Sequence, residues 1–272
     1  MSGVVSFPQL GNMGRCGNSL HQIIATWAYA LKHNKTVLFP EWKYFKYFDF
    51  PFPTSDNIVS AHHYNEPHFH YSEIPFFEGN VSLEGYFQSH LYHDDLDPTI
   101  LFELKDNWKE SIDELYEKIN PNGLHTCAIH VRRSDYLNPG TNEYHGVLPI
   151  DYYTAAISEV LYPYDISASK TMFIICSDDI GWCKEWFKGL GENTYFSETQ
   201  SMASCKEDYD IIDMYLMAKC SDNIIANSSF SWWSAMLNKN PNKKVVCPNN
   251  WFGETGKNNN TKDLLPENWI KI

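Results

Sequence analysis

Two adjacent arginines, Arg132 and Arg133, directly follow the short apolar segment 127–131. In an open α/β sheet the carboxyl ends of the strands line the ligand crevice, so two guanidinium groups at this point suit an anion such as a diphosphate. Arginine also offers a planar fork that holds phosphate oxygens in a bidentate manner. The alternative is that both arginines form ion pairs with Asp135 and with other carboxylates, because the chain contains 34 Asp and Glu residues.

Polar residues also follow two other apolar runs of the second half. Residues 177–179, Ser-Asp-Asp, come after the run 171–176, and residues 227–229, Asn-Ser-Ser, come after 223–226. Side chains that follow neighbouring parallel strands converge on one crevice. The two aspartates are equally suited to capping a helix N-terminus. Small hydroxyl residues that open a helix offer free N–H groups and hydroxyl donors to a phosphate.

Five segments, taken together, resemble the α-1,2-fucosyltransferases, glycosyltransferase family eleven. Residues 130–136 are similar to the first signature of that family, residues 224–235 to the second, and residues 246–252 to the third. Segments 85–89 and 14–18 also resemble family segments, and all five occur in the family's order. The resemblance implies an α/β fold of the GT-B-like kind, in which two Rossmann-like domains face a central cleft.

The spacing of apolar residues predicts the same kind of fold. Residues 4–7, 19–33 and 37–39 read as a strand, a helix and a strand, and 97–119 reads as helices with polar outer faces. The second half alternates strands and helices, which indicates a parallel sheet. Its expected strands are 126–131, 171–176, 223–226 and 244–247, and its expected helices are 150–161, 182–187, 208–219 and 231–238.

A turn cluster at residues 120–123 predicts the domain boundary. With this boundary, the resemblance implies an N-terminal acceptor-side α/β domain at 1–122 and a C-terminal Rossmann-like domain that binds GDP-fucose at 123–272. A net charge of -13 argues against a nucleic-acid partner. The sequence begins without a signal peptide and contains no apolar run of membrane-spanning length, which predicts a cytoplasmic enzyme without an integral membrane segment.

Metal chemistry is not expected. The seven cysteines are scattered and lack any zinc-binding spacing, and the clustered histidines of the region 62–70 have no acidic or cysteine partner at a recognisable distance. Residues 95–97 and 208–210 are Asp-x-Asp strings like those that hold a divalent ion in other glycosyltransferases, but both adjoin expected helices. Because the arginine pair can neutralise a leaving diphosphate, we predict no metal and no other cofactor.

The resemblance implies an inverting transferase that moves L-fucose from GDP-β-L-fucose to the 2-OH of a terminal β-galactoside in a glycan. Arg133 is expected to stabilise the β-phosphate oxygen and Arg132 to orient the pyrophosphate, while Asp213 resembles the residue that accepts hydrogen bonds from guanine. A general base is not identified among Glu41, Asp94, Asp178 and Asp179. The alternative function is a non-catalytic carbohydrate- or sugar-nucleotide-binding protein.

The residues expected to be catalytic are Arg133 and Arg132. The residues expected to bind the donor are Asn18, His130, Arg132, Arg133, Asp178, Asp213, Ser228, Ser229, Phe230 and Ser231.

Overall fold

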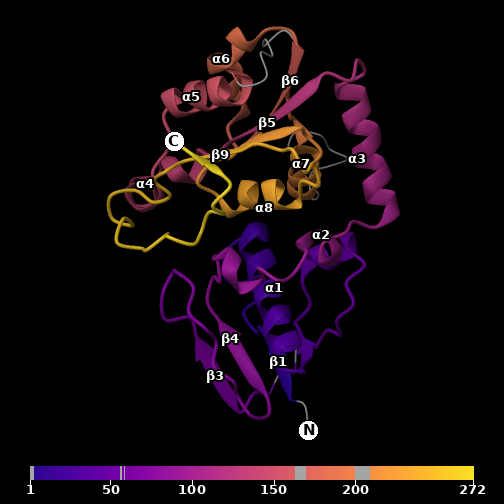
Figure 1. The fold of residues 1–272 in the computed structure, drawn as a ribbon, viewed down its shortest axis with the longest axis vertical. Coiled ribbons are helices and arrows are strands. Elements are labelled where there is room, and N and C mark those ends of the chain that lie inside the picture. Colours follow the sequence, from indigo (N-terminus) through magenta and orange to yellow (C-terminus); the bar gives the residue numbers. More distant parts are fainter. Residues whose placement is uncertain (1–2, 56, 58, 163–169, 200–208) are drawn as a thin grey trace. The chain divides into compact units, whose positions relative to one another are not determined.

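The structure is a computed structural model that describes residues 3–55, 57, 59–162, 170–199 and 209–272, and it contains two compact units (Figure 1). The first unit comprises Met1–Lys105 and Asn259–Pro266, and the second comprises Asp106–Asn258 and Glu267–Ile272. The expected boundary at residue 122 lies after helix α3 (Asp106–Ile119), whereas in the structure this helix already belongs to the second unit. The reason is that Ile119 and its neighbours pack against the sheet of the second unit.

The first unit is built on a four-stranded sheet in the order β2-β1-β4-β3, and every pairing in it is parallel. Its strands are β1 (Val4–Ser6), β2 (Thr36–Leu38), β3 (His62–Asn65) and β4 (Val81–Glu84). Helix α1 (Cys16–Lys32) connects β1 to β2 and buries Leu20, Ile23 and Ile24 completely. The predicted start of strand, helix and strand is confirmed. The strands β3 and β4 were not predicted, because the sequence of β3, His-His-Tyr-Asn, is polar and largely exposed.

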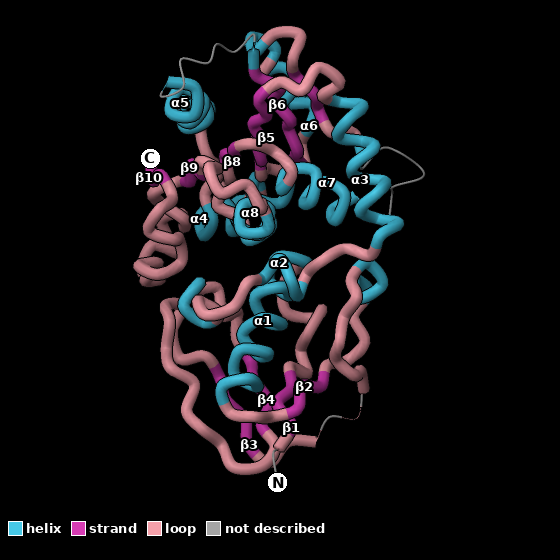
Figure 2. The backbone as a smooth tube through the Cα atoms, turned by 45° about the vertical axis from the view of Figure 1, so that its right-hand side comes forward, coloured by secondary structure: helices cyan, strands magenta, loops and turns pink. Residues whose placement is uncertain are grey.

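Loops make up much of the chain between β2 and α3, as Figure 2 shows. The short helical segments in this part are η1 (Lys43–Tyr47), η2 (His90–Tyr92) and α2 (Pro98–Leu101). Aromatic side chains pack these loops, and Tyr47, Phe48 and Phe102 are almost wholly buried. The high aromatic content of the sequence therefore serves, in part, to give a loop-rich unit its core.

The second unit is built on a six-stranded parallel sheet in the order β10-β9-β8-β5-β6-β7. Its strands are β5 (His125–Val131), β6 (Thr171–Ser177), β7 (Thr194–Phe196), β8 (Asp222–Ile224), β9 (Val245–Cys247) and β10 (Ile270–Lys271). The four predicted strands are confirmed with shifts of a few residues. β7, of three residues, and β10, of two, lie outside the prediction.

Helices cover both faces of this sheet (Figure 1). On one face, Ile129 and Val131 pack with Tyr153 and Cys183 of α5 (Ile150–Leu161) and α6 (Ile180–Trp186). On the other face, Ala128 packs with α3 and with α7 (Tyr209–Ala218). Burial on both faces explains why β5 is an almost continuous apolar run. The remaining helical segments are η3 (Ser134–Leu137), α4 (Pro139–His145), η6 (Lys188–Leu190) and α8 (Ser229–Leu237).

Within the described part of the chain, no helix combines the length and the apolar character that crossing a membrane requires.

Candidate active site

The carboxyl ends of β5 and β6 bring Arg132 and Asp178 together. These two strands pair along their whole length, with Val131 opposite Ser177, so the residues that follow each strand emerge side by side. Arg132 Nη1 lies 2.7 Å from Asp178 Oδ2, and Arg132 Nη2 donates a 2.5 Å hydrogen bond to Asp135 Oδ1. Two of the residues expected at the site therefore lie in contact, through the kind of ion pair that the sequence offered as the alternative for the arginines.

Arg133 is held differently. Its Nε donates to Asp179 Oδ2 at 3.1 Å, and the centre of its guanidinium lies 4.2 Å from the centroid of the Trp182 ring. Its backbone N–H donates to Asp178 Oδ1 at 2.8 Å. Neither Nη1 nor Nη2 of Arg133 has a hydrogen-bond partner among the residues that the structure describes. The end of this guanidinium that carries two nitrogens is thus free to form a fork with an anion.

Asp179 caps a helix, as one interpretation of its sequence predicted, and it also pairs with an arginine. Its Oδ1 accepts from the backbone N–H of Trp182 at 3.2 Å and so caps helix α6, while its Oδ2 pairs with Arg133. The carboxylate therefore ties the orientation of an arginine to the first turn of a helix. Such a partner restricts the rotamers of the guanidinium before any ligand arrives.

The start of α8 follows the central strand β8, which pairs with β5. Ser228 is the N-cap, and its hydroxyl accepts from the backbone N–H of Phe230 at 3.4 Å. Ser228, Ser229 and Phe230 are partly exposed. Ser231 is fully buried, and its hydroxyl donates to the carbonyl oxygens of Ala226 and Ser228, both at 3.3 Å. Its hydroxyl is therefore occupied within the protein.

His130 lies on β5 next to this helix start. Its ring centroid is 5.2 Å from that of Phe230, and the side chain is only 5% exposed. Burial, aided by the charge of Arg132, lowers the pKa of His130 to about 3, so the imidazole is neutral at pH 7. Its Nδ1 has no hydrogen-bond partner among the described residues. A neutral ring with an unsatisfied nitrogen can bind a hydroxyl or an N–H group, but it cannot supply positive charge.

Asp213 lies on α7, and its carboxylate faces the chain that follows β7. Ser197 Oγ donates to Asp213 Oδ1 at 2.6 Å, and Thr199 Oγ1 donates to the same oxygen at 2.9 Å. The residue is only 4% exposed, and burial raises the pKa of its carboxyl to about 6 although the two hydroxyls oppose this. A buried carboxylate is a suitable acceptor for the N–H groups of a base.

Asn18 belongs to the other unit. It lies on α1, where its Oδ1 accepts from Gln88 Nε2 at 2.7 Å. Gly14, at φ +89°, packs so closely on it that an added Cβ would meet Asn18 Nδ2 at 2.1 Å. The structure thus joins the resembling segments 14–18 and 85–89 to each other.

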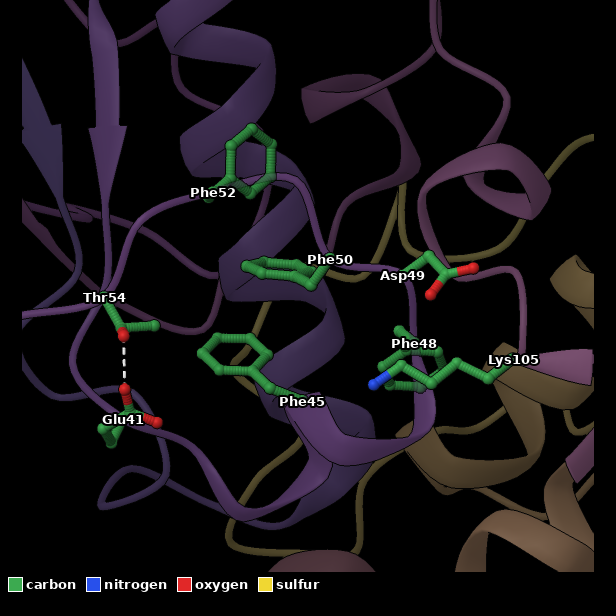
Figure 3. A pocket seen from close by; sticks show the side chains of 8 residues that line it. All are labelled: Glu41, Phe45, Phe48, Asp49, Phe50, Phe52, Thr54 and Lys105. Carbon is green, nitrogen blue, oxygen red and sulfur yellow. Dashed lines mark hydrogen bonds between the residues drawn. The ribbon is translucent and has the colours of Figure 1, made fainter. Parts of the chain in front are cut away.

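A pocket of about 520 Å³ opens in the first unit (Figure 3). Phe45 and Phe50 stack in it with their ring centroids 4.2 Å apart, and the Thr54 hydroxyl donates to Glu41. None of the residues expected to bind the donor lines it, but one of the four candidate bases does. The pocket is lined by Glu41, Phe45, Phe48, Asp49, Phe50, Phe52, Thr54 and Lys105.

In the Asp-x-Asp strings that resemble metal sites, Asp97 and Asp210 accept hydrogen bonds from the backbone of neighbouring residues. Asp97 is the N-cap of α2 and accepts from the backbone N–H of Thr99 at 2.9 Å. Asp210 lies in the first turn of α7 and accepts from the N–H of Ile211, while Asp208 falls outside the described residues. Among the described residues, no group of three or more His, Cys, Asp or Glu side chains is arranged to hold a metal ion.

Three residues near the site were missed by the sequence reasoning. Trp182 supports the Arg133 guanidinium, and Ser197 and Thr199 hold Asp213. The sequence placed Trp182 only on a helix, although its position five residues after the polar end of β6, Ser177, was a usable signal. The serine and the threonine follow the short strand β7, which had no recognisable pattern.

The sequence matches the model of Glycosyl transferase family 11 over residues 57–272. The O-antigen biosynthesis glycosyltransferase WbnK of Escherichia coli is 39% identical over 155 residues, which cover 56% of this chain and 48% of WbnK. An Alpha-1,2-colitosyltransferase of E. coli is 30% identical over 156 residues, which cover 53% of this chain and 51% of the relative. The chain thus spans about half the length of these curated relatives.

The fold is that of known fucosyltransferases. The crystal structure of NodZ α-1,6-fucosyltransferase soaked with GDP-fucose superposes with a TM-score of 0.56 and covers 87% of this chain and 93% of NodZ, at 14% sequence identity. The predicted α/β fold of the GT-B-like kind is therefore confirmed, with a parallel sheet in each unit. Because the family model covers most of the sequence, including all three signatures, the chain belongs to glycosyltransferase family 11.

Proposed function

We propose that this protein is an inverting galactoside α-1,2-fucosyltransferase that transfers L-fucose from GDP-β-L-fucose to the 2-OH of a terminal β-galactoside. The observation that carries the proposal is Arg133, whose two Nη atoms have no partner among the described residues while Asp179 and Trp182 fix the rest of the guanidinium. A preorganised fork at the carboxyl edge of a parallel sheet suits the departing β-phosphate.

The charges around the arginines explain why the two have different roles. The guanidinium of Arg132 contacts two carboxylates, those of Asp135 and Asp178, whereas the guanidinium of Arg133 contacts one, that of Asp179. A diphosphate that approaches Arg132 competes with both carboxylates, so Arg132 orients the pyrophosphate more than it neutralises it. Arg133 keeps its pair with Asp179 and adds the phosphate on its open side. The amides of the first turn of α8 supply further donors.

In the reaction, the bond between the fucose anomeric carbon and the β-phosphate oxygen breaks, and the electron pair leaves with GDP. The oxygen of the acceptor 2-OH forms the new bond from the opposite face, which inverts the anomeric centre from β to α. Its proton passes to a general base, for which the candidates are Glu41, Asp94, Asp178 and Asp179. Since charge grows on the β-phosphate oxygen during this step, Arg133 binds the transition state more tightly than the ground state.

Recognition of guanine by Asp213 is part of the proposal. Adenine offers no pair of N–H donors like the N1 and N2 groups of guanine, so a carboxylate acceptor selects GDP over ADP. Ser197 and Thr199 both donate to the same oxygen of Asp213, Oδ1. We propose that Oδ2 accepts from the guanine ring. Ligand hydrogen bonds to this carboxylate favour its charged form and offset its burial.

The reaction is proposed to be independent of metal ions. The arginine pair and the start of α8 meet the charge that a divalent ion meets in other transferases. The acidic residues Asp97 and Asp210 have local roles as described above, which supports the proposal. The donor substrate is then the only nucleotide required. A cytoplasmic location stays a prediction.

Two alternatives make different predictions. A non-catalytic sugar-nucleotide-binding protein binds GDP-fucose without releasing GDP. The similarity to a colitosyltransferase favours a second donor, the GDP derivative of colitose, for the same site. The deciding experiment incubates the protein with each GDP-sugar, with and without methyl β-D-galactopyranoside, and measures GDP release and the linkage of the product. Acceptor-dependent GDP release with GDP-fucose and an α-1,2 product supports the proposal, and tight binding without release contradicts it.

A further inference from the structure

A strained loop follows β4 at the carboxyl edge of the first sheet. Gly85 has φ +152°, and an added Cβ there would lie 2.4 Å from the Glu66 Cβ, so only glycine fits. Phe87, two residues later, has φ +50°, which is the left-handed conformation that non-glycine residues rarely adopt. A bulky residue in this conformation persists only where its surroundings hold it, and such strain gathers at functional sites.

Glu66 is the residue that holds the loop. It directly follows β3, and its Oε2 accepts from two successive backbone amides, that of Tyr86 at 2.8 Å and that of Phe87 at 3.0 Å. The Phe87 side chain is fully buried, with its ring against those of Phe7 (centroids 6.1 Å apart) and Tyr92 (5.1 Å). One carboxylate and one buried ring therefore fix the backbone on both sides of Tyr86.

Helix α1 fixes the same loop from its other end. Gln88 Nε2 donates to Asn18 Oδ1 at 2.7 Å, and Gln22 Nε2 donates to the Gly85 carbonyl oxygen at 3.3 Å. The residue between these anchors, Tyr86, points outward and is 40% exposed. The molecule thus keeps a strained and heavily anchored loop whose central side chain contributes little to the core.

We propose that Tyr86 is an acceptor-binding residue, that its ring receives the apolar face of the acceptor's galactose, and that Glu66 is the positioning residue for that ring. The inference rests on the function proposed above, because a transferase needs a second site for a neutral sugar. The carboxyl edge of a parallel sheet is where open α/β folds bind ligands. A pyranose has one apolar face and a rim of hydroxyls, which suits an aromatic ring with a polar tip such as tyrosine.

The test measures acceptor and donor kinetics separately, with methyl β-D-galactopyranoside as the acceptor and GDP affinity followed by calorimetry. Burial raises the pKa of Glu66 to about 7, so the assay is run at pH 8, where the carboxylate is charged. The Tyr86→Ala variant should raise the acceptor KM about tenfold, which is the expected effect of losing one ring contact. The affinity for GDP should be unchanged.

Three further variants make the result specific. Tyr86→Phe keeps the ring and should stay within about twofold of the wild-type KM. Glu66→Gln loses the charged acceptor of two amides, so it should raise the acceptor KM with little change in the KM for GDP-fucose. Phe76→Ala is the matched control: it removes an aromatic ring, 63% exposed, that packs on His33 at the far end of α1. It should leave the acceptor KM as it is.

The outcomes separate the inference from the function on which it rests. If the wild-type protein releases GDP in the presence of the galactoside but Tyr86→Ala has an unchanged acceptor KM and an unchanged melting temperature, the inference is wrong and the proposed function stands. If Tyr86→Ala weakens GDP binding as much as acceptor binding, the assignment to the acceptor is also overturned. If the wild-type protein transfers fucose to no galactoside, the proposed function itself fails.

Discussion

The Arg133→Lys substitution is the sharpest test of the donor site. Lysine keeps the positive charge but replaces the guanidinium with a single ammonium group, which can meet either Asp179 or the β-phosphate with good geometry. It also loses the planar contact with Trp182, which is 4.2 Å from the guanidinium centre. The variant therefore distinguishes a preorganised fork from a merely positive charge.

The magnitude follows from what the site loses. The Arg133–Asp179 pair is partly exposed, at 17% and 31% of the two side chains, so its loss should cost the fold at most about 1 kcal/mol. Removing one preorganised donor from a transition state costs about 2.7 to 4 kcal/mol. Since 1.36 kcal/mol corresponds to a factor of ten in rate, kcat should fall by about a hundredfold to a thousandfold. The affinity for GDP should fall by much less.

The assay is acceptor-dependent GDP release at saturating GDP-fucose, with calorimetric GDP binding and thermal unfolding measured on the same preparations. Arg132→Lys is the comparison variant, because both Nη atoms of Arg132 already contact carboxylates. It should weaken GDP binding at least as much as it lowers kcat. A folded Arg133→Lys protein that keeps most of its turnover would remove Arg133 from the mechanism and leave the arginine pair as a structural ion-pair cluster.

Three other predictions concern the same site. Asp179→Asn keeps the cap of α6, because asparagine caps a helix as well as aspartate does, but it removes the charge that holds Arg133. The kcat should therefore fall about tenfold, while the affinity for GDP is unchanged or rises. A fall in GDP affinity without a fall in kcat would contradict this. Burial raises the pKa of Asp213 to about 6 from its ordinary value of 3.8, so the folded state binds this proton more tightly, and stability is lost as pH rises through about 6. Asp213→Asn should therefore raise the free energy of unfolding at pH 8, measured with denaturant, by up to about 3 kcal/mol. The same variant should bind GDP more weakly by about 1.5 to 3 kcal/mol. Unchanged GDP affinity would exclude the guanine assignment. Transfer should be insensitive to excess EDTA, and an activity that chelation abolishes and Mn²⁺ or Mg²⁺ restores would refute metal independence.

Much of the second unit was predictable from the sequence, because its signals are local. Apart from His130, the run 127–131 is apolar on both faces of the strand, as a central parallel strand must be, and the polar residues after it can only emerge at the carboxyl edge. Helix α5 and the start of α8 follow in the same way from apolar spacing and from the cap at Ser228. Strand ends and helix starts therefore placed Arg132, Arg133 and Ser228 on one edge.

The first unit was less predictable for the opposite reason. The strands β3 and β4 pair with each other and with β1, but β3 carries polar side chains that give no strand signal. Their pairing depends on contacts with residues far away in the chain. The loop that displays Tyr86 likewise requires Glu66, which lies twenty residues earlier and reaches it only because β3 and β4 are neighbours.

The sequence by itself determined which residue types stand at the carboxyl edges of the strands, since that depends on the order of apolar and polar residues along the chain. Only the tertiary structure decided which of these residues form ion pairs and hydrogen bonds with one another. Arg132 and Asp178 meet because β5 and β6 are neighbours in register. Asp213 meets Ser197 because α7 packs on the face of the sheet to which Tyr195 of β7 also contributes. The strand order of a sheet is set by the packing of the whole unit, and no local pattern encodes it.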